Sequence, residues 1–195
     1  MRIIAGTAKG KTLVSPPDSR TRPTSDRARE GLFSSLESEY SSLDGLHFLD
    51  LFAGSGAVGV EALSRGAGVV HAVESESGIE IIATKNFHSI KSPIGIFRVF
   101  HTTAARFLAS DNAIEKGQYD IVFMDPPYEL SNQSIEELLE VIKTRDLLAP
   151  GGILAIERKS KSSPFTWPDG FEAIKVRSYG QGSIFYGGYS ASVLP

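Results

Sequence analysis

The chain has 195 residues, which favours one domain with a small appendage. Hydrophobic residues make up 41% and charged residues 22% of the chain, as in ordinary globular proteins, and we expect no membrane span because no apolar run reaches 18 residues. Cysteine is absent, which excludes disulfides, thiolate zinc sites and thiol catalysis. The N-terminus lacks the long apolar stretch of a signal peptide, so we expect a cytoplasmic protein.

The net charge of −3 is unevenly distributed. Residues 1–30 hold seven Lys and Arg against three acids, whereas the remainder holds thirteen against twenty. A basic segment on an acidic body indicates contact with a polyanion such as a nucleic acid, although it could also be a solvated face. Arg22 and Arg29 could instead pair with acids in one helix. The candidate RNA-binding residues are Lys9, Lys11, Arg20, Arg22 and Arg29.

The first 40 residues are predicted to form a basic extension made of a hairpin and a helix. Residues 2–4 favour a short strand, and the stretch 6–23, rich in Gly, Lys, Arg and Pro, favours a hairpin or loop. Thr24 or Ser25 could cap the helix that follows. The apolar face of that helix would be formed by Ala28, Leu32, Phe33 and Leu36.

Strand and helix patterns alternate over residues 41–195, the predicted main domain. A capping box at Ser134 and Glu137 marks the last helix. Its apolar stripe would be Ile135, Leu138, Leu139 and Ile142. Alternation of this kind predicts right-handed βαβ units and a parallel sheet with helices on both faces. The buried strands are predicted at residues 46–52, 68–74, 95–100, 119–124 and 153–157.

The end of the chain departs from this alternation. Residues 171–179 and 183–189 are both strand-like and are joined by a Gly-Gln-Gly turn, which predicts a hairpin. We therefore expect an α/β fold with a Rossmann-like sheet of seven mostly parallel strands and an antiparallel edge strand.

A glycine turn follows the first predicted strand. Gly54, Gly56 and Gly59 satisfy the G-x-G-x-x-G pattern, in which glycine allows a tight turn and a close approach of ligand to backbone. Glu74 ends the second strand, where a carboxylate can accept hydrogen bonds from ribose hydroxyls. These features alone also fit an NAD(H)-binding enzyme.

Asp50 favours a different cofactor. It ends the first strand just before the glycine turn, where an additional carboxylate would repel the pyrophosphate of a dinucleotide. S-adenosylmethionine has no phosphate and carries an ammonium and a sulfonium. Thr103 could contact the adenine ring, but it could equally cap the next helix. The predicted cofactor site comprises Asp50, Phe52, Gly54, Ser55, Gly56, Glu74 and Thr103. No metal is expected, because the four His residues do not cluster.

The tetrad Asp125-Pro126-Pro127-Tyr128 follows the fourth predicted strand, and these four are the candidate catalytic residues. The exocyclic amine of a base is a poor nucleophile because its lone pair is delocalised into the ring. The Asp125 carboxylate and the Pro126 carbonyl could orient its hydrogens, and the prolines restrict the loop. Tyr128 offers a face for stacking, worth roughly 1–3 kcal/mol per base. The base would be flipped out to reach this site, and its proton could pass to Asp125 or to water.

Motifs spread over nearly the full length carry a family resemblance. They are Arg2-Ile3-Ile4-Ala5-Gly6, Lys9-Gly10, Arg22-Pro23-Thr24, Asp26, Arg29-Glu30, Leu32-Phe33, Asp50-Leu51-Phe52-Ala53-Gly54-Ser55-Gly56, Glu61-Ala62-Leu63-Ser64-Arg65-Gly66-Ala67 and the Asp-Pro-Pro-Tyr tetrad. With these stretches the chain resembles the RsmD family of class I S-adenosylmethionine-dependent methyltransferases, which methylates N2 of a guanine in 16S ribosomal RNA.

The resemblance implies that the glycine turn, Asp50 and Glu74 line the cofactor site and that the tetrad holds the guanine. It also implies that the basic N-terminal segment contacts 16S rRNA in the small ribosomal subunit. One stretch, at residues 101–103, departs from the family, whose members often have an acidic residue there. A DNA or other RNA amino-methyltransferase and a non-catalytic RNA-binding module are the alternatives. We expect a monomer.

Overall fold

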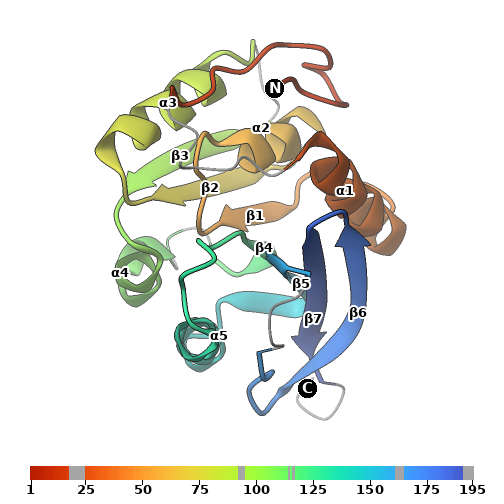
Figure 1. Cartoon of the computed structure of the whole chain (residues 1–195), viewed down its shortest axis with the longest axis vertical. Helices are drawn as coiled ribbons and strands as arrows, with labels where there is room; N and C mark the ends of the chain where they lie inside the picture. Colours follow the sequence, from red (N-terminus) through yellow and green to blue (C-terminus); the bar gives the residue numbers. More distant parts are fainter. Residues whose placement is uncertain (18–24, 92–94, 114, 116, 161–164, 191–195) are drawn as a thin grey trace.

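The computed structural model describes residues 1–17, 25–91, 95–113, 115, 117–160 and 165–190. Its centre is a seven-stranded sheet in the order β3-β2-β1-β4-β5-β7-β6 (Figure 1). The strands are β1 (His47–Asp50), β2 (Val69–Glu74), β3 (Ile96–His101), β4 (Tyr119–Met124), β5 (Leu148–Lys159), β6 (Phe171–Tyr179) and β7 (Gly182–Tyr189). The first five strands are parallel, and both pairings of β7 are antiparallel, which confirms the predicted mostly parallel fold with a terminal hairpin.

Helices cover both faces of this sheet (Figure 1). They are α1 (Asp26–Tyr40), α2 (Ala57–Ser64), α3 (Ser77–His88), α4 (Ala104–Ala109) and α5 (Asn132–Thr144), with a short 3-10 helix at Asp111–Ala113. Alternate strand residues point to opposite faces, so Phe48 and Phe123 pack under α1, α2 and α3, whereas Leu49 and Val122 pack against α4 and α5. This alternation decides which strand-end side chains share a face.

The N-terminal segment is held tightly to the sheet domain. An isolated bridge between Arg2 and Thr12 closes a small hairpin. The buried carboxylate of Glu61 in α2 accepts hydrogen bonds from the backbone N–H groups of Ile4 and Ala5, at 2.8 and 2.9 Å. Gly6 has a φ of +79°, and a side chain there would collide with the carbonyl of Ser64. The hairpin therefore packs on α2 as part of the same structure.

Two local predictions are corrected. The side chain of Ser131 caps α5 by accepting the N–H of Ser134, so Ser134 lies inside the helix and is not its cap. Strand β5 already begins at Leu148 and runs through the Pro-Gly-Gly stretch, where a shift in its pairing with β4 accommodates these residues. Of the two cap candidates for α1, Ser25 fulfils the role by accepting the N–H of Ala28.

Candidate functional site

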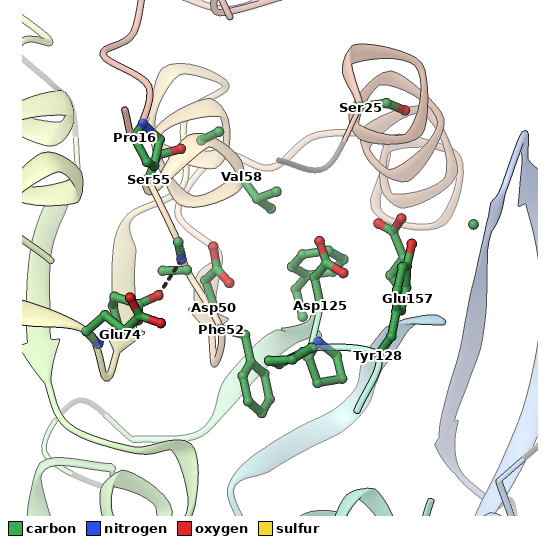
Figure 2. Close-up of a pocket in the computed structure, with 18 of the residues that line it drawn as sticks. Pro16, Ser25, Asp50, Phe52, Ser55, Val58, Glu74, Asp125, Tyr128 and Glu157 are labelled. Atoms are coloured by element: carbon green, nitrogen blue, oxygen red, sulfur yellow. Dashed lines mark hydrogen bonds between the residues drawn. The ribbon is translucent and has the colours of Figure 1, made fainter. Parts of the chain in front are cut away.

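A cavity of about 290 Å³ lies at the carboxyl ends of the parallel strands (Figure 2). Ligands of open α/β sheets bind at this end because the strand-to-helix loops gather there. The loops after β1, β2 and β4, the end of β5 and the turn between β6 and β7 all contribute to its wall. The lining residues include Asp50, Phe52, Gly54, Ser55, Glu74, Asp125, Pro126, Pro127, Tyr128, Glu157, Tyr179 and Gln181.

The glycine turn is held by Glu74. One carboxylate oxygen of Glu74 accepts the Gly54 N–H at 2.8 Å, and the other accepts the Glu76 N–H at 2.8 Å (Figure 2). Gly54 has a φ of +52°, and the position of its missing side chain is open space. A ligand can therefore approach the backbone here without obstruction.

The other two glycines serve packing. A side chain at Gly59 would lie 2.8 Å from the Phe87 ring and 3.1 Å from Val70, so glycine lets α2 pack closely on the sheet. Gly56 has a φ of +78° and precedes α2 directly. Asn86 in α3 donates to the Ser55 carbonyl at 2.8 Å. Its side chain also accepts the Val14 N–H and donates to the Val14 carbonyl. The N-terminal segment and the glycine turn are thus fixed by one side chain.

Asp50 is a buried carboxyl group at the cavity. Its exposed fraction is 1%, and neither of its oxygens has a hydrogen-bond partner among the described residues. Burial and the nearby Asp125 carboxyl raise the pKa of Asp50 to about 8. The backbone N–H groups of Phe52 and Gly59 oppose this shift but do not reach hydrogen-bond geometry. A buried acceptor of this kind is suited to a cationic ligand.

The Asp-Pro-Pro-Tyr loop begins directly after β4. Asp125 and Pro126 are partly or fully buried, while Tyr128 is 42% exposed and presents an accessible ring. The Leu130 N–H closes the loop onto the Pro127 carbonyl at 2.9 Å. This arrangement gives a carboxyl group, fixed carbonyls and an aromatic ring on one side of the cavity (Figure 2).

Arg158, which the sequence reasoning did not single out, holds this loop through contacts with its carbonyl groups. Its side chain is buried and donates to the Leu130 carbonyl at 2.9 Å, with a longer contact of 3.5 Å to the Pro127 carbonyl. Burial lowers the pKa of Arg158, and the nearby Tyr128 opposes this shift. Its neighbour Glu157 was also missed and lines the cavity itself. The signal in the sequence for both residues was their position at the end of the fifth strand, the sheet edge where ligands bind.

The remaining predicted site residues lie in different parts of the structure. Lys9 lies in the turn of the N-terminal hairpin and Lys11 on its returning arm, where the Lys11 carbonyl accepts the Ile3 N–H, whereas Arg20 and Arg22 fall outside the described residues. Thr103 caps α4 by accepting the Arg106 N–H and is absent from the cavity wall as described.

Arg29 requires a correction. It has an exposed fraction of 0%, donates to the Arg2 carbonyl and to Asp26, and lies 3.7 Å from the buried Glu61 carboxylate. Direct contact with RNA does not fit this burial. Arg29 instead joins α1, α2 and the N-terminal hairpin.

Within the part of the chain that the structure describes, no group of three or more His, Asp or Glu could hold a metal ion. None of the described helices is both long and apolar enough to cross a membrane.

The fold and the cavity define the class: a Rossmann-like methyltransferase, with a glycine turn after the first strand and an Asp-Pro-Pro-Tyr loop after the fourth. The chain belongs to the family described as conserved hypothetical protein 95, whose model matches residues 1–187. This is the RsmD family, so the predicted resemblance is confirmed.

Individual relatives agree with this assignment. The chain is 33% identical over 182 residues to ribosomal RNA small subunit methyltransferase D of Escherichia coli (strain K12). The matched region covers 93% of this chain and 86% of that relative. The solved structure of yhhF from Escherichia coli matches with a TM-score of 0.81 at 32% identity, over 98% of both chains. Magnesium protoporphyrin IX methyltransferase from Synechocystis PCC 6803, solved with bound SAM, shares the fold alone, with a TM-score of 0.61 at 14% identity over 89% of this chain and 86% of that one.

Proposed function

We propose that this protein transfers a methyl group from S-adenosylmethionine to the N2 amine of a guanine in 16S rRNA of the small ribosomal subunit. The observation that carries the proposal is that one cavity joins the glycine turn, the buried Asp50 and the Asp-Pro-Pro-Tyr loop. The family and its named relatives support the RNA substrate and the reaction. We also propose that the protein acts in the cytoplasm as a monomer.

The cavity residues fit S-adenosylmethionine better than a dinucleotide. Asp50 offers two buried oxygens without a hydrogen-bond partner among the described residues, and the ammonium of the methionine moiety would favour their ionised form, whereas a pyrophosphate has no donor to offer them. Glu74 keeps lone pairs for ribose hydroxyls after accepting two backbone N–H groups, because a carboxylate has about four acceptor positions. When bound, the cofactor supplies an electrophilic methyl group on a sulfonium.

The loop after β4 would hold the base. Tyr128 would stack on the guanine, and Asp125 or the Pro126 carbonyl would accept an N2 hydrogen, which directs the nitrogen lone pair toward the methyl group. On transfer, N2 would gain the methyl group and become cationic, and Asp125 or water would take up the proton that N2 then loses. Arg158 keeps the loop carbonyls in place during this step.

Lys9 and Lys11 would contact RNA phosphates outside the cavity. Their hairpin is fixed to α2 and α3, so their position relative to the cavity is set by Glu61 and Asn86. Phosphate contacts add affinity without reading sequence.

The proposal is tested by methyl transfer from labelled S-adenosylmethionine to small ribosomal subunits that lack their native methylations, with naked 16S rRNA and DNA in parallel. We expect label in RNA, recovered as N2-methylguanosine at one site. Label in DNA or in adenine would favour the amino-methyltransferase alternative. Tighter binding of NAD than of S-adenosylmethionine would contradict the cofactor assignment.

A further inference from the structure

Glu157 lies beside the proposed base site without a role in the reaction described above. It occupies the carboxyl end of β5, next to β4, and the pairing of Met124 with Ile156 makes Asp125 and Glu157 the next residues along the two strands. Because strand side chains alternate, both point to the face that carries α1 and α2, as Phe123 and Ala155 do. In Figure 2 both carboxyl groups project into the same open space.

The carboxyl group of Glu157 is held in a confined position. Its exposed fraction is 8%, and it lines the cavity together with Asp125 and Tyr128. Gly182 makes room for it, because a side chain at that position would come within 2.6 Å of a Glu157 carboxylate oxygen. Tyr179, at the end of β6, and Gln181, directly before β7, also line the cavity.

Guanine presents the matching donors. Its Watson–Crick edge carries N1–H and N2–H₂ side by side, and a carboxylate can accept both in a bidentate pair. Adenine and cytosine each offer a ring nitrogen acceptor beside the exocyclic amine, which a carboxylate would repel. A base stacked on Tyr128 with its amine at Asp125 would turn the neighbouring ring nitrogen toward the adjacent strand end, where Glu157 lies.

We propose that Glu157 selects guanine by accepting N1–H and the N2 hydrogen beside it, while Asp125 or the Pro126 carbonyl accepts the other N2 hydrogen. The proposal rests on the proposed function, because it assumes that the base enters at the Asp-Pro-Pro-Tyr loop. Glu157 is then the residue that distinguishes this site from sites for adenine or cytosine with the same tetrad.

The test uses 16S rRNA that carries either guanine or 2-aminopurine at the nucleotide that the wild-type protein methylates, assembled into small subunits. 2-Aminopurine keeps the N2 amine but has an acceptor at N1. Wild-type protein should methylate guanine about tenfold to a hundredfold faster, the range expected for one bidentate pair. Glu157→Gln places an amide opposite N1 and should reverse or abolish this preference, with an unchanged Kd for S-adenosylmethionine.

The outcomes distinguish a failure of the proposed function from a failure of the role of Glu157. If wild-type protein methylates no guanine N2, the proposed function fails. If it methylates guanine N2 but also 2-aminopurine at an equal rate, or if Glu157→Gln keeps the guanine preference, the role of Glu157 is overturned and the function stands. Glu157→Asp, which keeps the charge, should retain the preference at a lower rate and serves if Glu157→Gln does not fold. Glu172→Gln, on the exposed edge strand, is the matched control.

Discussion

The carboxylate of Glu74 accepts the backbone N–H of Gly54 at 2.8 Å, so the acid at the end of β2 fixes the turn that follows β1. The second oxygen of Glu74 fixes Glu76 in the same way. This acid is therefore a structural part of the glycine turn as well as a candidate partner of the cofactor ribose.

Substitution at Glu74 should weaken cofactor binding in steps. Glu74→Gln loses one of two acceptor oxygens and should raise the Kd for S-adenosylmethionine about tenfold, consistent with the loss of one charge-assisted hydrogen bond. Glu74→Ala should raise it further because Gly54 also loses its partner. Isothermal titration checks both values, with Glu80→Gln on α3 as control. Unchanged affinity in Glu74→Ala would refute the assignment.

Cofactor affinity should depend on pH through Asp50. With the pKa of Asp50 raised to about 8, this group is protonated in the free protein at neutral pH and must lose its proton to accept a cation. The Kd for S-adenosylmethionine should therefore fall as pH rises from about 5.5 to 7.5, by at most about tenfold per pH unit. Asp50→Asn should bind weakly and without this slope. A flat profile in the wild-type protein would contradict the prediction.

The pH dependence of the free protein's stability tests the protonation of Asp50 independently. A raised pKa means that the folded state keeps a proton which the unfolded chain has released above its ordinary value of 3.8. Stability is therefore greatest below that value and is lost as pH rises toward about 8. Denaturant unfolding should show that Asp50→Asn removes this part of the pH dependence.

The loop after β4 should depend on Arg158. Removing its guanidinium leaves the Leu130 carbonyl without its 2.9 Å partner and frees the loop that would hold the base. Arg158→Ala should lower kcat by at least about tenfold while the Kd for S-adenosylmethionine changes little, because the cofactor side of the cavity is untouched. Single-turnover methylation measures the effect, with exposed Lys85→Ala as control. A change confined to cofactor affinity would disagree with this role.

Arg29 should matter for stability and not for RNA contact. Arg29→Ala removes a buried cation beside Glu61, which keeps its 2.9 Å bond to Arg65, so we expect a loss of about 3 kcal/mol, or roughly 6–12 °C in Tm. The double variant Lys9→Ala, Lys11→Ala should keep its Tm but bind RNA more weakly, with a salt slope reduced by about two. Arg29→Ala with normal Tm and weakened RNA binding would reverse this interpretation.

Much of the fold could be predicted from local patterns. Strand β4 ends where the apolar run gives way to Asp125, and the terminal hairpin follows from its two strand-like stretches around glycines. The cap of α5 was misplaced because Ser131 and Ser134 both precede the apolar stripe, and only backbone geometry distinguishes them. The start of β5 was missed because Pro150 and two glycines normally end a strand.

The misassigned Arg29 and the two missed residues of the cavity region depend on contacts between distant segments. Arg29 looks exposed in a basic segment, and only folding brings it to Glu61, 32 positions away. Glu157 and Arg158 sit in a strand end with no motif of their own, and their roles arise because β5 lies beside β4 and neighbouring side chains point to opposite faces.

The nucleoside composition of 16S rRNA from a host strain that lacks this gene tests the proposed methylation in the cell. We predict that one N2-methylguanosine disappears and returns when the wild-type gene is restored, but not with Asp125→Ala, whose product should still bind S-adenosylmethionine. Unchanged N2-methylguanosine in the deletion strain would exclude the proposed methylation, and restoration by Asp125→Ala would exclude the proposed role of Asp125.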